Sequence, residues 1–143
     1  KEITTEGGLN LFKNRIKINR MLLELRKNKI RSSLFINANK KNILLAKKLN
    51  ADCVEIHTGK LSNLIKSKKN YTHELNMIKL CSKLAKSIGL EVHAGHGIDF
   101  KCIKILNKIN EIEEFNIGHF IISESIFDGF KKVIKKFIKL LNG

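Results

Sequence analysis

The chain has 143 residues, with 28 Lys or Arg against 13 Asp or Glu, and its formal net charge at pH 7 is +15. A chain of this length buries one hydrophobic core, so we expect one domain or a part of a larger domain. No stretch resembles a signal peptide, and no apolar run is long enough to span a bilayer, so the sequence does not predict a membrane protein.

The first half of the chain alternates between helical and strand patterns. Apolar residues at helical spacing predict a helix over residues 9–29, and a short apolar run predicts a strand over 33–37. A second helix is predicted over 39–49 and a second strand over 53–57. Residues 60–70 are rich in Lys, Ser and Asn, and this composition predicts an exposed, mobile loop.

The second half continues the alternation. The same patterns predict, in order, a helix over 72–88, a strand over 90–94, a helix over 100–108, a strand over 114–118 and a helix over 126–141. Residues 120–122 are expected to continue the last strand or to turn outward. In the last helix, Phe127, Phe130 and Phe137 fall on one apolar stripe, which we expect to face the core.

Strict alternation of strands and helices favours a parallel sheet covered by helices. Along each strand, polar or small residues alternate with apolar ones; Glu55 and His57, for example, oppose Val54 and Ile56. A doubly wound sheet has two apolar faces, whereas a (β/α)8 TIM barrel has helices outside and a lumen inside. We therefore expect residues 1–143 to be the C-terminal half of a single barrel domain, with the N-terminal half absent from this sequence.

Three His-containing segments follow predicted strands, where the active site of such a barrel lies. His96 stands between two glycines, and an imidazole held there can transfer protons near neutral pH, although an isolated strand-ending turn with a solvated His has the same pattern. Gly118 and His119 follow the last strand, where either a phosphate site or merely a tight turn is expected.

The remaining polar residues of the strands allow two interpretations each. Glu55 is either a functional carboxylate or one that is paired inside the lumen. For His93 we favour a hydrogen-bonded core histidine, and for His57 both interpretations stand equally. A metal site could use Glu55, His57, His93, His96 or His119, but none shows a typical ligand spacing, so we predict no metal.

The positive charge suggests nucleic-acid binding as an alternative function. Most of it comes from lysines on the polar faces of predicted helices, and no aromatic residues interleave with them. The chain begins with Lys1 and not Met, so we expect a fragment, a processed product or one piece of a split chain. The odd set Cys53, Cys81 and Cys102 predicts reduced thiols and a cytoplasmic location.

Four segments, residues 4–9, 55–59, 93–97 and 116–119, together resemble the pyridoxine 5′-phosphate synthase family, the ring-closing enzymes of the deoxyxylulose-dependent route to vitamin B6. The resemblance runs from the first residue to the last and corresponds to the C-terminal part of the family's chain. It implies a (β/α)8 barrel that condenses 1-deoxy-D-xylulose 5-phosphate with 3-amino-2-oxopropyl phosphate.

The resemblance also implies roles for individual residues. Thr4 would contact the deoxyxylulose phosphate, Glu55 would stabilise charge in the transition states, and His96 would donate a proton. The aminoketone phosphate would be held by Gly97, Gly118 and His119. Apart from the resemblance, we consider His57, His93 and Asn116 as candidates for support of the lumen.

The family further implies no metal or organic cofactor and assembly into a homo-octamer. Because the N-terminal half of the barrel would supply the other catalytic residues, we expect this chain alone to be inactive. Two alternatives remain: a non-catalytic half-barrel remnant that binds phosphate ligands, and a basic nucleic-acid-binding protein.

Overall fold

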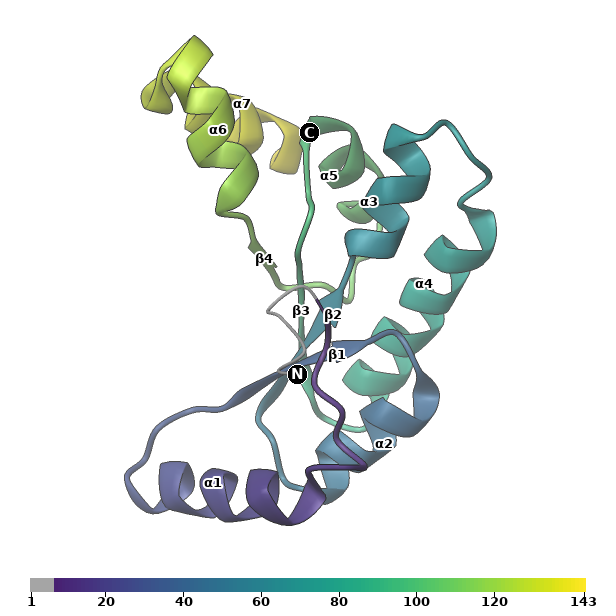
Figure 1. Cartoon of the computed structure of the whole chain (residues 1–143), viewed down its shortest axis with the longest axis vertical. Helices are drawn as coiled ribbons and strands as arrows, with labels where there is room; N and C mark the ends of the chain where they lie inside the picture. The colour runs from purple at the N-terminus through teal and green to yellow at the C-terminus, as the bar shows by residue number, and fades with distance from the viewer. Residues whose placement is uncertain (1–6) are drawn as a thin grey trace.

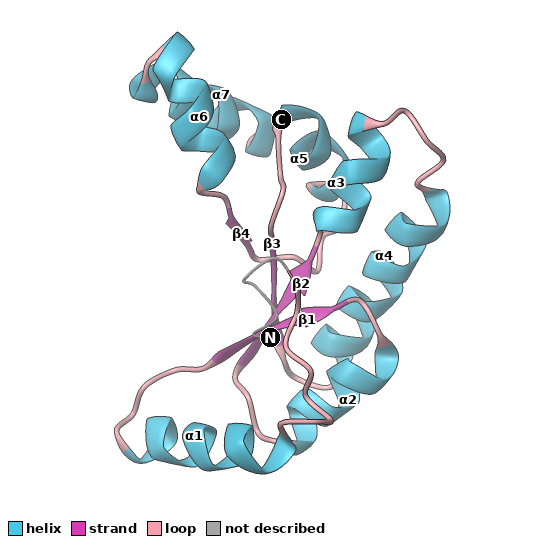
Figure 2. Ribbon diagram, viewed as in Figure 1, coloured by secondary structure: helices cyan, strands magenta, loops and turns pink. Residues whose placement is uncertain are grey.

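The computed structural model describes residues 7–143, so Thr4 lies outside the described residues. Helices and strands alternate along this part of the chain (Figures 1 and 2). The elements are α1 (Arg15–Lys27), β1 (Ser33–Asn37), α2 (Lys40–Lys48), β2 (Cys53–His57), α3 (Gly59–Lys66), α4 (Thr72–Ser87), β3 (Glu91–Gly95), α5 (Phe100–Leu106), β4 (Glu114–Asn116), α6 (His119–Asp128) and α7 (Phe130–Leu141).

The four described strands form one parallel sheet in the order β1-β2-β3-β4. This sequential order confirms the predicted α/β fold with a parallel sheet, and it is consistent with half of a barrel. The strands predicted over 33–37 and 53–57 have those bounds, and the third is shifted by one residue. The last strand is shorter than the predicted 114–118, because it pairs with β3 only up to Asn116.

The two faces of the sheet differ as their sequences predict. Val54, Ile56 and Val92 are fully buried on one face, and α4 packs against β2 and β3 there. Figure 1 shows α2 and α4 together on this side of the strands. The opposite face carries the half-buried side chains of Phe35 and Glu55. The sheet therefore presents one core face and one face suited to a lumen.

The predicted loop over residues 60–70 is wrong in its first half. Residues Gly59–Lys66 form α3, and Leu61 and Ser62 in it are fully buried. The prediction of a loop relied on composition alone. Leu61, Leu64 and Ile65 lie at helical spacing, and this pattern predicts a helix despite the surrounding Lys, Ser and Asn residues. The first helix also differs, since it starts at Arg15 and not near residue 9.

The single helix predicted over 126–141 is two helices. Gly129 has φ of +80°, a left-handed conformation that ends α6 and begins α7. Residues 120–122 lie within α6, so of the two alternatives for them, continuation of the last strand is wrong. The break also leaves Phe127 and Phe130 exposed, although both were expected on the buried stripe.

An aromatic cluster joins the last three helices. Phe100 of α5, Phe120 of α6 and Phe137 of α7 have ring centroids 4.7–6.0 Å apart. Among the helices and strands of the described chain, α6 makes its most extensive contacts with α7, and α7 packs on α5. The position of α6 therefore depends on this cluster. None of the helices described over residues 7–143 has the length and apolar character needed to cross a membrane.

Candidate functional site

A cleft lies at the C-terminal ends of the strands. Its walls come from the ends of β2, β3 and β4 and from the helices α3 and α6 that follow them. The residues lining it include Glu55, Asn63, Lys66, His96, Gly97, Asn116, Gly118, His119 and Ser123. Side chains that are far apart in the sequence thus meet because parallel strands bring their C-terminal ends to one edge.

The turn after β3 has a strained backbone. His96 has φ of +78°, a left-handed conformation that is uncommon for any residue with a side chain, and Gly97 after it has φ of +74°. Buried Thr58 stabilises this turn: its backbone N–H donates to the carbonyl oxygen of Gly95 at 2.8 Å. Its hydroxyl lies 2.8 Å from the carbonyl oxygens of both Gly95 and His96.

A second hydroxyl group stabilises the same turn: the side chain of Ser62 in α3 donates a hydrogen bond to the carbonyl oxygen of Gly97. Both hydroxyls belong to residues that follow β2. The segment after β2 therefore stabilises the backbone conformation of the turn after β3. A strained conformation persists only where its surroundings enforce it, and such residues gather at functional sites.

The ring of His96 stacks on the ring of His57, with centroids 4.8 Å apart and planes inclined by 27°. Phe35 contacts His57 edge-on, with centroids 5.3 Å apart. Gly59 lies beneath this pair, and a Cβ there would come within 2.7 Å of the His96 ring. The side chain of His96 is therefore exposed to the cleft but constrained by its neighbours.

Glu55 is half-buried on the face of β2 opposite the core face. Burial raises the pKa of its carboxyl group, and the hydrogen bond that Asn116 Nδ2 donates to Glu55 Oε2 at 3.0 Å acts in the opposite direction. Gly95 on the neighbouring strand makes room for the carboxylate, since a Cβ there would lie 2.0 Å from Glu55 Oε1. Glu55 can thus stabilise positive charge that develops in the cleft.

Gly118 and His119 stand at the start of α6. The first turn of a helix leaves backbone N–H groups without partners and carries a partial positive charge, so it favours anions. Across the cleft, α3 contributes Asn63 and Lys66. Sequence analysis missed these two residues because it assigned them to a loop; the helical spacing of Leu61 and Ile65 is the signal that identifies α3.

The structure brings most of the predicted site residues together but not all of them. The cleft is lined by Glu55, His96, Gly97, Asn116, Gly118 and His119. His57 lies in an adjoining hollow, where it meets His96. His93 is buried away from the cleft, with its Nε2 2.8 Å from Glu91 Oε1, and so resembles the core histidine that we favoured.

The five possible metal ligands considered from the sequence do not form one cluster. Over residues 7–143, the grouping of three or more metal-binding side chains consists of Cys53, Glu91 and His93, of which only His93 belongs to that set. Cys53 and Glu91 are the first residues of β2 and β3, whereas His93 is paired in register with Glu55 of the cleft.

Comparison with known proteins gives a consistent result. The family model described as "Pyridoxal phosphate biosynthesis protein PdxJ" matches residues 1–143. A protein of Pelagibacter ubique named pyridoxine 5′-phosphate synthase is 58% identical over 142 residues, which are 99% of this chain and 59% of that protein.

More distant relatives carry the same name. The protein of Trichlorobacter lovleyi is 39% identical over 141 residues, covering 99% of this chain and 59% of its own length. The protein of Campylobacter fetus is 34% identical over 163 residues, covering 99% of this chain and 63% of its own length. The chain therefore spans about three fifths of the length of these curated relatives.

Proposed function

This chain belongs to the family of pyridoxal phosphate biosynthesis protein PdxJ, and from that membership we propose that it is the C-terminal part of a pyridoxine 5′-phosphate synthase. The observation that carries the proposal is the agreement of two results. The family match covers the whole chain, and Glu55, His96, Gly118 and His119, which the family resemblance singles out, line one cleft.

The proposed reaction joins 1-deoxy-D-xylulose 5-phosphate to 3-amino-2-oxopropyl phosphate and closes the pyridine ring of pyridoxine 5′-phosphate. Imine formation, loss of water and ring closure each move protons to or from the reacting atoms. His96 is the proton donor, since its imidazole is exposed in the cleft and its position is set by Thr58 and His57.

Glu55 stabilises the positive charge that develops on the reacting nitrogen. Its carboxylate lines the cleft, and its partial burial strengthens its interaction with a cation. Asn116 holds it through the 3.0 Å hydrogen bond, so the carboxylate does not need to reorganise during the reaction.

The aminoketone phosphate binds at the start of α6, against Gly118 and His119. Gly97 borders the same part of the cleft, and Lys66 of α3 adds a positive charge opposite. A phosphate anchored in this way places the ketone near His96, and such positioning contributes much of the rate in a reaction of two substrates.

The full protein completes a (β/α)8 barrel around the lumen face of this sheet. Thr4, beyond the described residues, contributes to the deoxyxylulose phosphate site, and the N-terminal half supplies the remaining groups, so this chain alone is inactive. Three free buried thiols support the proposed cytoplasmic location. We propose the homo-octamer of the family as the assembly.

The test is a turnover assay. The full-length protein, mixed with the two substrates, releases pyridoxine 5′-phosphate, which chromatography with mass detection identifies. The variant His96→Asn serves as the matched negative control, because it keeps the size and hydrogen bonding of the side chain but does not titrate.

Each alternative has its own outcome in the same experiments. A well-folded full-length protein that binds both phosphates but makes no product identifies a non-catalytic remnant. Binding of DNA or RNA that weakens steeply with salt, without turnover, identifies a basic nucleic-acid-binding protein.

A further inference from the structure

A row of titratable side chains crosses the sheet on the face opposite the core. Glu55 of β2 is paired in register with His93 of β3, and His93 in turn is paired with Glu114 of β4. Side chains in register on neighbouring parallel strands point to the same face, and such strands lie about 4.8 Å apart. The sheet therefore places one imidazole between two carboxyl groups, and one of these, Glu55, lines the cleft.

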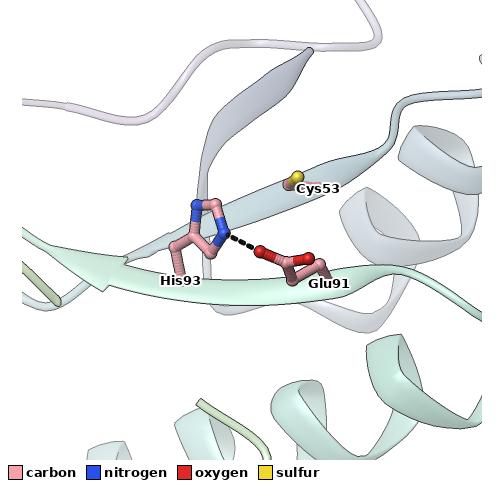
Figure 3. Close-up of side chains that lie close together, drawn as sticks. All are labelled: Cys53, Glu91 and His93. Atoms are coloured by element: carbon pink, nitrogen blue, oxygen red, sulfur yellow. Dashed lines mark hydrogen bonds and ion pairs between the residues drawn. The ribbon is translucent and has the colours of Figure 1, made fainter. Parts of the chain in front are cut away.

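Both ring nitrogens of His93, which is 5% exposed, face polar groups. Its Nε2 lies 2.8 Å from Glu91 Oε1, and Figure 3 shows the imidazole directed toward that carboxylate. Its Nδ1 lies 3.5 Å from Ser33 Oγ and 3.8 Å from Glu114 Oε1. A distance of 2.8 Å is typical of a hydrogen bond between ionised partners. The surroundings therefore suit an imidazolium, which donates from both nitrogens.

The charges around the ring favour the same form. Three carboxyl groups belong to this part of the sheet, that of Glu55 and the two that face the ring nitrogens. Arg31 is ion-paired with Glu91 on the side away from the ring, and burial raises the pKa of the neighbouring Cys53 thiol, which keeps it neutral. Since nearby carboxylates favour a charged imidazole, a proton on His93 balances the excess of negative charge.

We propose that His93 is a positioning residue of the proposed synthase: protonated between its carboxylate partners, it keeps the neighbouring Glu55 ionised. The inference rests on the proposed function for the use that Glu55 makes of its charge. Burial is the largest influence on the pKa of Glu55 and raises it, and the charge of Glu114 acts in the same direction. The hydrogen bond from Asn116 and the charges of His93 and His96 lower it.

The consequence for the cleft is a carboxyl group that is half-buried and yet charged. A carboxyl group stabilises a developing cation only when it is ionised, whereas partial burial by itself favours the neutral form. Asn116 contributes a neutral donor from β4, and His93 contributes a charge from β3. His93 therefore acts through Glu55 and not on the substrate.

The test uses the full-length protein and compares the parent with His93→Gln, which keeps hydrogen-bonding capacity but loses the charge. Infrared spectroscopy at several pH values follows the C=O stretch of the protonated Glu55 carboxyl, assigned by its loss in Glu55→Gln. In His93→Gln this band appears about one pH unit higher than in the parent, and the acidic limb of the kcat profile shifts with it. His73→Gln, on the exposed face of α4, leaves both unchanged.

Glu91→Gln keeps the test decisive if His93→Gln does not fold, as judged by circular dichroism. The loss of a negative charge by itself lowers the pKa of Glu55, but the loss of the partner of His93 releases the imidazole proton and raises that pKa. An upward shift of the Glu55 titration therefore identifies His93 as the intermediary. The inference is overturned if folded His93→Gln titrates like the parent, or if Glu91→Gln shifts the band downward or not at all.

The infrared titration does not depend on turnover, so it separates two failures. If the parent makes no pyridoxine 5′-phosphate while the band shifts upward in His93→Gln, the proposed function is wrong and the effect of His93 on Glu55 is supported. If the parent turns over and neither the band nor the acidic limb shifts in folded His93→Gln, the role of His93 is overturned and the proposed function stands.

Discussion

Carboxyl groups near the N-terminal ends of the strands have lowered pKa values, whereas the carboxyl group in the cleft has a raised one. At the N-terminal end, Asp52 accepts hydrogen bonds from the backbone N–H and the hydroxyl of Ser32, both at 2.8 Å, and these lower its pKa. Hydrogen bonding to His93 likewise lowers the pKa of Glu91. For Glu55, in the middle of β2 and lining the cleft, burial instead raises the pKa.

The backbone conformation also differs between the beginning and the end of these strands. Strands β2 and β3 begin with regular pairing between Cys53 and Glu91, whereas β3 ends in the left-handed conformation of His96. One end of the sheet thus satisfies its charges and contributes stability. The cleft instead holds a half-buried carboxylate and a histidine with a strained backbone, which is the expected cost of a reactive site.

The largest expected effect comes from His96→Gly, which removes the imidazole and the strain together. Activity of the full-length protein falls by roughly 10²–10⁴-fold, as for loss of a general acid. The free energy of unfolding rises by about 1 kcal/mol, because Gly adopts the left-handed conformation without a steric cost. Steady-state kinetics and chemical denaturation measure the two quantities.

Lys29→Gly is the matched control for this substitution. Lys29 also has a positive φ, of 56°, but is exposed beyond the end of α1 and away from the cleft. The Lys29→Gly variant is expected to have a higher free energy of unfolding and unchanged activity. If His96→Gly loses stability instead, the strain that we assign to this turn is not there.

The next effect concerns Glu55→Gln, expected to lower kcat by roughly 10²-fold through loss of charge stabilisation. Because burial raises the pKa of Glu55 in the folded state, the folded state binds more protons than the unfolded state. The free energy of unfolding therefore falls as pH rises from about 4 through the folded pKa of Glu55. The glutamine variant loses that decline and is relatively more stable at neutral pH, which denaturation at several pH values measures.

A smaller effect is expected for Lys66→Ala, which removes the cation that α3 places opposite the start of α6. If the proposed reaction holds, the KM for the proposed aminoketone phosphate substrate rises by roughly 10-fold, corresponding to the loss of one charged contact. Lys83→Ala, on the exposed face of α4, is the control for simple loss of positive charge. Equal KM values for the two variants contradict the assignment of Lys66.

The smallest effect is expected for Asp52→Asn at the stable end. The loss of charge-assisted hydrogen bonds to Ser32 lowers the free energy of unfolding by about 1 kcal/mol at neutral pH. Since the folded pKa of Asp52 is lowered, its contribution exists above about pH 4 and disappears as pH falls through that folded value. Activity at neutral pH stays unchanged, and the difference in stability between variant and parent vanishes in acid.

Much of this arrangement could be predicted from alternation along the strands. The pattern of Glu55 and His57 against Val54 and Ile56 distinguished the core face from the opposite face, and the strand order brings the C-terminal ends of the strands together. These inferences succeed because a period of two residues is enforced by burial on one face. The family resemblance supplied the roles, which still await the experiments above.

What sequence analysis missed depends on contacts between distant segments. The left-handed turn at His96 is enforced by Thr58 and Ser62, which belong to another strand–helix unit. The grouping of Cys53 with Glu91 depends on the register between β2 and β3, whereas the spacing rules for metal ligands describe residues close in sequence. Composition alone also misassigned α3, and with it Lys66.

The aromatic cluster of Phe100, Phe120 and Phe137 has a consequence for the dynamics of the cleft. Strand β4 has only three residues, and α6 is attached to the rest of the fold chiefly through α7. We therefore expect α6 and α7 to open together, as one cooperative unit, before the strands separate. A phosphate bound at Gly118 would close that unit, so substrate binding would slow amide hydrogen exchange as far away as Leu141, at the end of α7.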